Sequence, residues 1–425
     1  MALPLFGIFF LTAFIGLPIA VALLLAAGVP LFLFTDTPLM VIIQRLWVSL
    51  DSFSLMALPF FMIAGGILEK GGVSKRIVDF ANSIVGGFHG GLAIVAFVAS
   101  AFFGAISGSS TATVVAMGSI IVPAMIREGY DVKFSITTIA AAGYLGTVIP
   151  PSIPMVTYGV TTGASIGDLF SGGIMTGLLL TGLMSVYAYL YGKKHMKVTY
   201  KFSIKEVWRT FKNAIWALIM PLIILGGIYS GVFTPTESAA VACLYGLIVG
   251  FFVYKELSWK KVNQILKESV VNASMIMFIV GAASAFGFVM TKAQIPLQMS
   301  EFIISLTDSA IILLFLVNIL FLILGTFMET NAAILIVAPI FMPIIEQYGI
   351  DPVHFGVLMV VNLSIGMVTP PLGVNLFVAA KLIDGVSVSD ILNKYLFRYI
   401  GFSLIGLLII TYWEDFVLFL PKLFG

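Results

Sequence analysis

The sequence predicts an all-α polytopic membrane protein with two inverted-topology repeats, and three observations lead to this prediction. Of its 425 residues, 60% are hydrophobic and 10% are charged, whereas soluble globular domains are roughly 45 to 50% apolar and about 25% charged. The apolar residues form runs long enough to cross a bilayer, which takes about 20 residues. Special residues in one half of the chain recur in the other at a nearly constant spacing.

Composition excludes several other classes of protein. The net charge of +2 leaves no basic face for nucleic acid, so we expect no nucleic-acid partner. The single cysteine, Cys243, excludes a disulfide framework and a multi-cysteine metal site, and we expect no organic cofactor. The first apolar run has no basic segment before it and extends to about residue 34, so we expect a retained helix rather than a cleaved signal.

The apolar runs divide the chain into elements. In the first half they cover residues 3–34, 53–68, 91–126, 134–163, 170–191, 214–233 and 237–254. In the second half they cover residues 270–291, 309–345, 354–380 and 395–420. We therefore predict an N-terminal helix and amphipathic arm that belong to a scaffold (1–52), a first repeat (53–191), a cytoplasmic basic loop with a scaffold helix pair (192–269), and an inverted second repeat that ends in a C-terminal helix (270–425).

Two runs are too long for a single span and contain polar interruptions. Residues 91–126 are interrupted by Gly104 and by a serine-rich stretch, and residues 309–345 by Gly325 and Glu329. Polar, irregular backbone at membrane depth survives only where protein or a water-filled cavity covers it. We therefore expect each run to fold back as a re-entrant helical hairpin.

The repeat and the loop charges together predict opposite orientations for the two halves. Pro123 and Pro343 are 220 positions apart, as are Gly146 and Gly366. The loop at residues 192–213 contains seven Lys or Arg against one Glu and should be cytoplasmic, whereas residues 346–353 contain neither Lys nor Arg. Inverted repeats are typical of secondary transporters, whose substrate and ion sites lie near the midplane at the repeat interface.

Each half also contains a predicted broken helix, at residues 134–163 and 354–384. In both, a Pro-Pro pair follows a Gly-x-Val sequence, at Pro150 and Pro370. Proline removes a backbone donor and disfavours helix in the preceding residue. The freed carbonyls can bind a cation, and the restarted half-helix offers its N-terminal dipole to an anion. The alternative is a plain proline kink.

Placing each hairpin tip beside the broken helix of its own half gives two oxygen-lined sites suited to a hard cation such as Na⁺. Glu329 is the most informative single residue, because an acid at membrane depth is costly and usually functional. The alternative is that these Ser and Thr side chains only satisfy local backbone. The first site comprises Ser107, Ser109, Ser110, Gly146, Thr147, Val148 and Ile149. The second comprises Gly325, Glu329, Thr330, Asn331, Gly366, Val368 and Thr369.

A substrate is expected between the two broken helices. There are no Lys or Arg residues from 309 to 380, so an anion there must rely on helix dipoles, hydroxyls, amides and bound cations. The candidate substrate ligands are Ser152, Thr157, Asn362 and Asn375. Other polar residues favour structural roles, with Thr234, Glu237, Asp168 and Asp390 at helix starts and His89, His195 and His354 in or next to loops.

Four segments resemble the large membrane (M) subunit of tripartite ATP-independent periplasmic (TRAP) transporters. They are FGAISGSSTAT at 103–113, GTVIPPSIP at 146–154, FTPTESAA at 233–240 and VTPPLG at 368–373. The resemblance covers nearly the whole chain. It departs at the second tip, where Glu329 and its neighbours replace the serines of the first, so the two sites should differ chemically.

The resemblance implies Na⁺-coupled uptake of an organic acid, such as a sialic-acid-type sugar acid or a C4-dicarboxylate, across the bacterial inner membrane. It also implies an elevator mechanism, with sodium held at the hairpin tips and broken helices named above. Its implied partners are a small four-helix membrane (Q) subunit, a periplasmic substrate-binding (P) protein and membrane lipid. Since no further N-terminal spans are evident, we expect a chain that is not fused to the small subunit.

Three alternatives remain open from the sequence. A stand-alone sodium–anion symporter would work without a binding protein. An intramembrane serine protease could use Ser107 in Gly-x-x-Ser-Gly, but it needs a general base within reach, and we expect no histidine at membrane depth. A passive channel would explain midplane polar sites but not paired hairpins.

Overall fold

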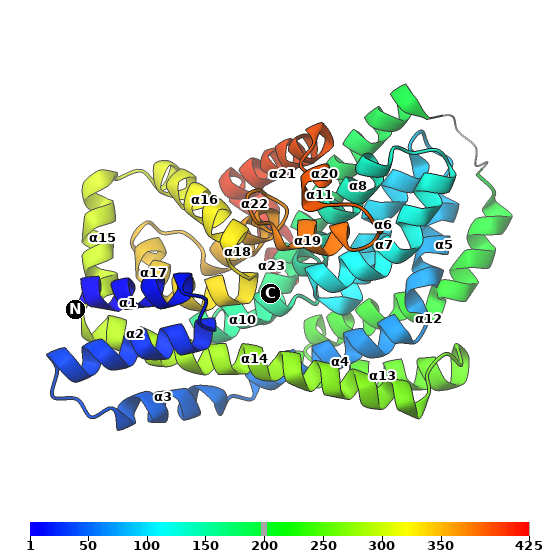
Figure 1. The fold of residues 1–425 in the computed structure, drawn as a ribbon. Coiled ribbons are helices and arrows are strands. Elements are labelled where there is room, and N and C mark those ends of the chain that lie inside the picture. Colours follow the sequence, from blue (N-terminus) through cyan, green and yellow to red (C-terminus); the bar gives the residue numbers. More distant parts are fainter. Residues whose placement is uncertain (197–201, 425) are drawn as a thin grey trace.

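The described chain is helical (Figure 1), and a large hydrophobic core takes residues from both halves of the sequence. The structure, a computed structural model, describes residues 1–196 and 202–424, and in these ranges it contains no β-strand. Nine helices of the described chain are long and apolar enough to cross a membrane. The prediction of an all-α, multi-pass fold is therefore confirmed.

The N-terminal segment differs from the prediction of one helix at residues 3–34, which is wrong. Two short helices, α1 (Ala2–Phe14) and α2 (Ile19–Phe34), pack side by side. The chain turns at Gly16, whose φ is +91°, and Pro18 precedes the second helix. Glycine tolerates this left-handed conformation, which other residues rarely adopt, so a turn replaces the expected continuous span.

The other helices follow in chain order. The first half contains α3 (Met40–Leu50), η1 (Ser54–Met56), α4 (Ala57–Lys70), α5 (Val73–Val85), α6 (Gly91–Ser107), α7 (Ser110–Arg127), α8 (Val132–Gly143), α9 (Leu145–Val148), α10 (Ile153–Thr162), α11 (Ile166–His195), α12 (Ile204–Tyr229), α13 (Pro235–Ile248) and η2 (Val249–Val253). The second half contains α14 (Trp259–Lys292), α15 (Ile295–Leu306), α16 (Ala310–Phe327), α17 (Thr330–Gln347), α18 (Pro352–Gly366), α19 (Val374–Ala380), α20 (Val388–Ile391), α21 (Lys394–Tyr412), α22 (Glu414–Val417) and α23 (Phe419–Phe424).

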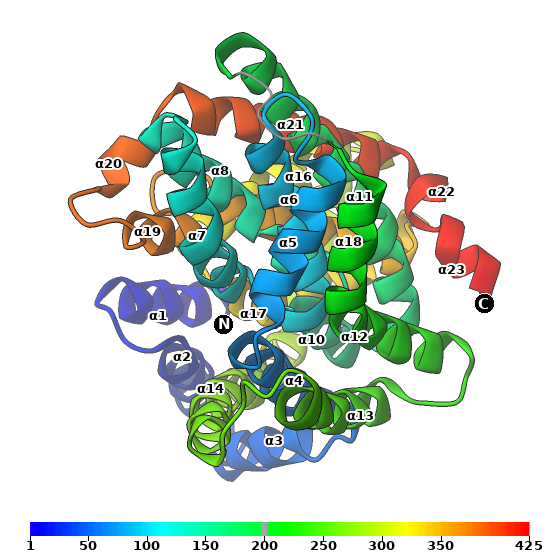
Figure 2. The ribbon, with the colours of Figure 1, turned by 90° about the vertical axis from the view of Figure 1, so that its right-hand side faces the viewer.

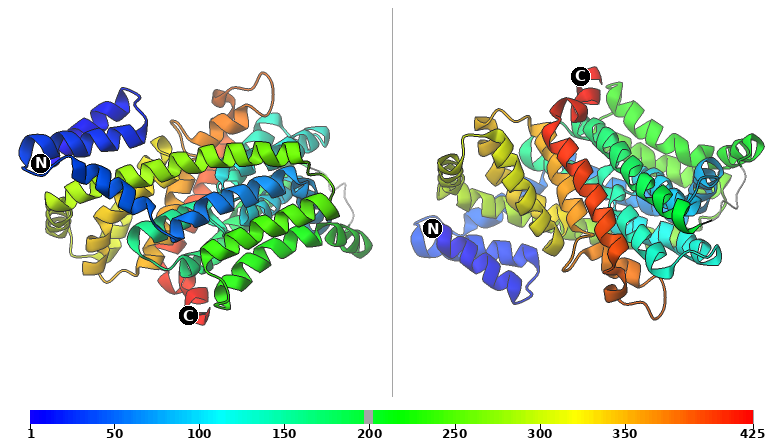
Figure 3. Two further views of the ribbon diagram at one scale, coloured as in Figure 1. Left: turned by 90° about the horizontal axis from the view of Figure 1, so that it is seen from below. Right: turned by 90° about the horizontal axis from the view of Figure 1, so that it is seen from above.

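Helix α14 runs along one side of the molecule and packs against α2, α3 and α4 (Figure 3, left, the long yellow-green helix). It begins at Trp259, so the boundary predicted between residues 269 and 270 falls inside a helix. Polar pairs extend the helix beyond its apolar run, because Glu268 accepts hydrogen bonds from Gln264 (2.8 Å) and from Lys70 of α4 (2.6 Å). Such i,i+4 pairs stabilise exposed helical turns.

Two helical hairpins reach the centre of the molecule from opposite ends. Figure 1 shows α6 and α7 on the right and α16 and α17 on the left. Each hairpin crosses the broken helix of its own half at a pair of glycines. A Cβ on Gly104 would lie 2.9 Å from Gly146 Cα, and one on Gly325 would lie 3.1 Å from Gly366 Cα. The same close backbone approach is therefore built twice.

The broken helices lie beside these hairpins. The first consists of α8, α9 and α10, and the second of α18 and α19. Regular helix stops at Val148 in the first and at Gly366 in the second, and both Pro-Pro peptide bonds are cis.

Helix caps account for several polar residues outside the centre. Thr234 and Glu237 form a reciprocal capping box at the start of α13, and Ser165 caps α11 by accepting from the backbone N–H of Asp168. His354 differs from the expected interfacial position. It is buried, and its Nε2 lies 2.8 Å from the carbonyl oxygen of Ile410, since α21 packs over the start of α18.

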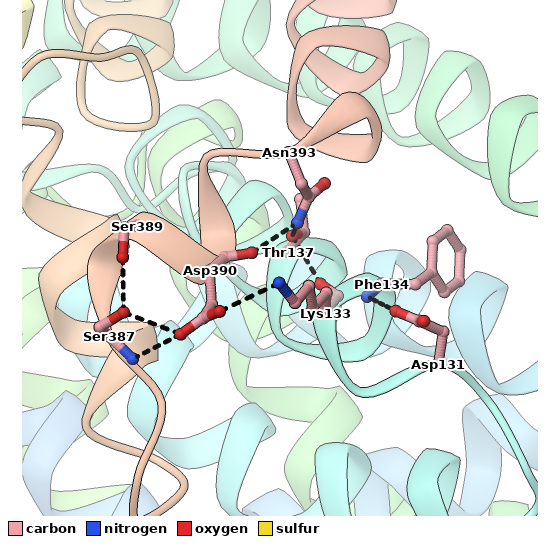
Figure 4. A network of polar contacts seen from close by, with 8 residues as sticks. All are labelled: Asp131, Lys133, Phe134, Thr137, Ser387, Ser389, Asp390 and Asn393. Atoms are coloured by element: carbon pink, nitrogen blue, oxygen red, sulfur yellow. Dashed lines mark hydrogen bonds and ion pairs between the residues drawn. The ribbon is translucent and has the colours of Figure 1, made fainter.

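A polar network joins the two halves at the start of α8 (Figure 4). Lys133 forms an ion pair with Asp390 at 3.0 Å, and the Asn393 side chain donates to the Thr137 hydroxyl at 3.0 Å. Ser387 donates to the same Asp390 carboxylate and shares a capping box with it. Hydrogen bonds from Ser387 and then from Lys133 lower the Asp390 pKa to about 2.

Candidate functional site

Both hairpin tips open onto one cavity of about 360 Å³. Its wall includes residues 108–111 of the first tip, Glu329 and Asn331 of the second tip, and Asn272 of α14. The broken helices contribute Thr147 and Met367, among others. The described lining contains one carboxylate, Glu329, and no Lys or Arg. The cavity therefore brings together elements from both halves and from the long helix α14.

Oxygen atoms of the first tip gather against the first broken helix. The Ser107 hydroxyl lies 3.3 Å from the Thr113 hydroxyl, which donates to the Ser109 carbonyl at 2.7 Å. A Cβ on Gly146 would lie 2.2 Å from that threonine oxygen and 2.5 Å from the Ser109 carbonyl. The absence of a side chain at Gly146 thus lets two oxygens approach the unwinding backbone. Uncharged oxygens of this kind suit a hard cation.

The second tip is organised around a carboxylate. Glu329 caps α17, where its Oε2 accepts from the backbone N–H groups of Asn331 (2.9 Å) and Ala332 (3.2 Å). Its Oε1 accepts from the Asn331 side chain at 2.7 Å. Thr330 is buried and donates to the Met367 sulfur at 3.3 Å. An N-cap carboxyl group stabilises the helix start and also presents acidic oxygens at the cavity wall.

Each tip is tied to the restarted helix of the other half. Ser110 and Asn375 of α19 exchange two hydrogen bonds, of 2.9 and 2.7 Å. Thr157 of α10 donates to the Asn331 side-chain oxygen at 2.9 Å. All four side chains are buried. Two residues predicted to bind substrate, Thr157 and Asn375, are thus placed where they hold a tip of the opposite repeat.

None of the four candidate substrate ligands is part of the described cavity lining, and the other two, Ser152 and Asn362, also have partners inside the protein. Ser152 caps α10 and donates to the Thr147 carbonyl at 2.5 Å, so its hydroxyl bridges the helix break. Asn362 is buried against α16, where its side-chain N–H donates to the Asn318 side-chain oxygen at 2.7 Å.

The remaining predicted cation ligands lie at the breaks or beside them. The Thr147 hydroxyl lies 2.8 Å from the Ser364 hydroxyl of α18, a direct contact between the two broken helices. The Thr369 hydroxyl donates to the Ile365 carbonyl at 2.9 Å. Val148 and Val368 are buried, and Ile149 is half-buried.

Sequence reasoning missed two polar residues of this region. Thr113 provides a hydroxyl at the first tip, and Asn272 projects from α14 into the cavity lining. Asn272 could have been found, because it is the single asparagine in the apolar run at 270–291, where polar residues are costly. Thr113 lies one helical turn after Ser109, inside α7, and the hydrophobic periodicity of this segment does not distinguish it from other helical residues.

Opposed hairpins, paired broken helices and a shared cavity that receives polar residues from both tips define a multi-pass membrane transport protein. The Ser107 hydroxyl contacts Thr113 and the Ser109 carbonyl, not a histidine. This leaves the serine without the base that a protease needs.

The chain belongs to the family described as "Tripartite ATP-independent periplasmic transporter, DctM component", which matches residues 6–416. It is a transporter permease and not an enzyme.

Several relatives share this family assignment. The chain is 42% identical over 402 residues to the C4-dicarboxylate TRAP transporter large permease protein DctM of Pseudomonas aeruginosa, covering 94% of each. It is 44% identical over 415 residues to the isethionate TRAP transporter permease protein DctMQ of Oleidesulfovibrio alaskensis, covering 96% of this chain. It spans 64% of that longer relative.

A solved structure shares the fold. The YdaH transporter of Alcanivorax borkumensis, reported to have an unusual topology, superimposes with a TM-score of 0.67 and 18% sequence identity. The match covers 97% of this chain and 98% of the YdaH chain. At this level of identity the likeness concerns the fold alone.

Proposed function

We propose that the protein imports an organic acid anion across the bacterial inner membrane, driven by co-transported Na⁺. The observation that supports this most is the shared cavity, where two oxygen-rich hairpin tips meet and the described lining contains no basic side chain. An anion in such a cavity needs cations for charge balance, and the tips offer hydroxyl, carbonyl and carboxylate oxygens for them.

The two cation sites follow the assignment made from the sequence. The first uses the Ser109 carbonyl, the Ser107 hydroxyl and the backbone near Gly146. The second uses the Glu329 and Asn331 side chains together with the backbone from Gly366 to Thr369. We propose that sodium at each site fixes its tip against the broken helix, so that bound sodium completes the anion site. Transport then moves the hairpins and broken helices as one body against α14, as in an elevator.

The protein works with two partners in this proposal. A small four-helix membrane subunit stabilises the scaffold in the bilayer, and a periplasmic binding protein delivers the substrate. Relatives named for C4-dicarboxylate, isethionate and 2,3-diketo-L-gulonate support a small organic acid as cargo. Sialic acid stays a candidate only because the family resemblance seen in the sequence implies it.

Uptake into proteoliposomes tests the proposal. The chain is reconstituted with its small subunit and given radiolabelled isethionate, succinate, diketogulonate or sialic acid, each with and without an inward Na⁺ gradient and the binding protein. We expect one acid to accumulate only when both are present. Accumulation without the binding protein would favour the stand-alone symporter. Accumulation without a Na⁺ gradient would contradict the cation sites.

A further inference from the structure

A second cavity, of about 490 Å³ and with a polar wall, shares no described lining residue with the cavity between the hairpin tips. It is formed by the first turns of α5, the middle of α12 and the segment that follows η2. Figure 2 faces this end of the molecule and shows α5 beside α12. Its described wall contains the charged residues Lys75, Arg76, Asp79, Lys212 and Glu256 and the aromatic residues Trp216 and Tyr254.

One side of this cavity is held rigidly by Arg76. Its guanidinium forms an ion pair with Glu256 at 2.7 Å and lies 3.9 Å from the centre of the Tyr254 ring. Tyr254 is fixed in turn, because its hydroxyl donates to the Asn213 carbonyl at 3.1 Å. The ion pair neutralises Glu256, and cation–π contact stabilises the arginine. Arg76 and Glu256 are therefore already matched to each other.

Among the described residues, the other three charges of the cavity, those of Lys75, Lys212 and Asp79, lack an ion-pair partner within 4.0 Å. Lys75, Arg76 and Arg209 are nevertheless near enough to interact electrostatically with Asp79. The Lys212 ammonium lies 5.3 Å from the Trp208 ring. Two ammonium groups and one carboxylate thus face one cavity, a pattern complementary to a ligand with one phosphate and one amine.

Exposed aromatic side chains close to this cavity are typical of the headgroup level of a bilayer. Trp216 lines the cavity, Trp208 lies beside the Lys212 ammonium, and Trp259 follows Glu256 by three residues. These three side chains are 43%, 58% and 78% exposed. Phe252, next to the cavity segment, is 74% exposed. Tryptophan concentrates at the membrane–water interface, and basic pockets between membrane helices on the cytoplasmic side bind phospholipid headgroups. The basic loops at this end are those that the charge pattern predicts to be cytoplasmic.

We propose that this cavity binds the headgroup of an inner-leaflet aminophospholipid, with the phosphate between Lys75 and Lys212 and the amine against Asp79. The acyl chains then run along the exposed apolar face of α12, past Trp216 and Leu222. Such a lipid ties α5 to α12 and to the start of α14. This inference does not depend on which acid or ion is transported.

Native mass spectrometry tests the proposal on the complex with its small subunit. The purified complex is titrated with phosphatidylethanolamine, phosphatidylcholine or phosphatidylglycerol of matched acyl chains, and retained lipid is counted. We expect phosphatidylethanolamine to be retained about tenfold better than phosphatidylcholine, whose amine has no N–H to donate. The Lys212→Gln variant should lose retention of every lipid. Asp79→Asn should remove the preference for ethanolamine and leave retention of phosphatidylglycerol intact.

Matched controls keep the result specific. Lys260→Gln and Asp384→Asn change exposed charges outside the cavity lining and should behave like the natural sequence. Equal retention of the three lipids by the natural sequence would overturn the proposal. Full competition by soluble glycerophosphoethanolamine would instead indicate a site for a free phosphoester. Lipid retention that vanishes when the small subunit binds would show that a protein surface occupies the cavity.

Discussion

The two halves share a pattern of hairpin and broken helix, but they differ in how the break is covered. In the first half, Pro150, Pro151 and Ser152 are buried, and the serine hydroxyl bridges the break. In the second half, Pro371 is exposed, and Leu372 occupies the position that corresponds to Ser152, with 44% exposure. The helix break of the first half is thus buried by its own side chains, whereas the break of the second half is exposed.

The hairpin tips differ in charge as well. Ser109 caps α7 with a neutral hydroxyl, whereas Glu329 caps α17 with a carboxylate. A carboxylate attracts a cation more strongly than neutral oxygens do. We therefore expect the exposed second site to determine the sodium affinity of uptake. We expect the enclosed first site to exchange its sodium ion with solvent more slowly. A repeated backbone can in this way support two chemically different sites.

The largest effect is expected from filling the glycine crossings that the halves share. A Cβ on Gly366 would lie 2.5 Å from Gly325 backbone atoms, and one on Gly146 would lie 2.5 Å from the Ser109 carbonyl. Overpacking of this kind typically destabilises the folded state by about 1 to 3 kcal/mol. At these two glycines the added methyl group would meet backbone atoms, so the backbone itself must move. Gly366→Ala and Gly146→Ala should each abolish uptake by protein still inserted in the membrane.

Gly401→Ala is the matched control for both glycine variants, because a Cβ there meets no atom within 4 Å. It should transport normally. If Gly146→Ala transports normally while Gly366→Ala does not, the two glycine crossings are not equivalent. That result would contradict the claim that the halves share this feature.

The next effect concerns the charge difference between the tips. Glu329→Gln keeps a side-chain oxygen for the cap but removes the charge. It should raise the Na⁺ concentration for half-maximal uptake by about tenfold, the size of one lost charge-assisted interaction. Ser109→Ala should change it less, since the Ser109 carbonyl stays. The Na⁺ dependence of initial uptake rates measures both, and a larger shift for Ser109→Ala would reverse the proposed roles.

A smaller effect is expected from the two cross-repeat contacts. Double-mutant cycles on Ser110→Ala with Asn375→Ala, and on Thr157→Val with Asn331→Ala, should each give a coupling of about 1 kcal/mol. The reciprocal Ser110 pair should couple more strongly than the single bond from Thr157. Thermal unfolding in detergent provides the free energies. Additive effects in both cycles would mean that the halves are not tied together at their tips.

The smallest effect is expected at the ion pair between Lys133 and Asp390. The pKa of Asp390 falls from an ordinary 3.8 to about 2 through its bonds to Ser387 and Lys133. A depressed pKa means that this stabilisation is present above pH 3.8 and is lost as the pH falls towards 2. Asp390→Asn should leave uptake near neutral pH within about twofold, as for other exposed pairs. A large loss in a proteoliposome assay would point to a role in movement.

Structural elements could be predicted from the sequence where a residue type has one dominant structural role. The serine-rich interruption of the apolar run at 91–126 and Glu329 in the run at 309–345 coincide with the turns after Ser107 and before Thr330. The Thr234 capping box was readable for the same reason, because its spacing is fixed by helix geometry. The turn at Gly16 was missed, since its flanks are apolar on both sides and no charge marks the end of a helix.

Side-chain partners were harder to predict than elements. Asn375 and Thr157 were placed near the centre, but their bonds to the opposite tips depend on how two distant segments pack. Asn362 was likewise expected at the centre, but its side chain bonds to Asn318 of α16. A small rotation of α18 about its axis determines which neighbouring helix this side chain contacts. Periodicity gives the face of a helix only when polar and apolar residues alternate, and α18 is apolar on nearly every side.

The most direct test of the central claim is the number of sodium ions that accompany each substrate molecule. Radioactive sodium and labelled substrate are followed together in proteoliposomes that contain the complex and its binding protein. The two-site account predicts more than one Na⁺ per substrate for the natural sequence and a lower ratio for Glu329→Gln. Substrate uptake with no accompanying sodium, or an unchanged ratio in that variant, would contradict the account.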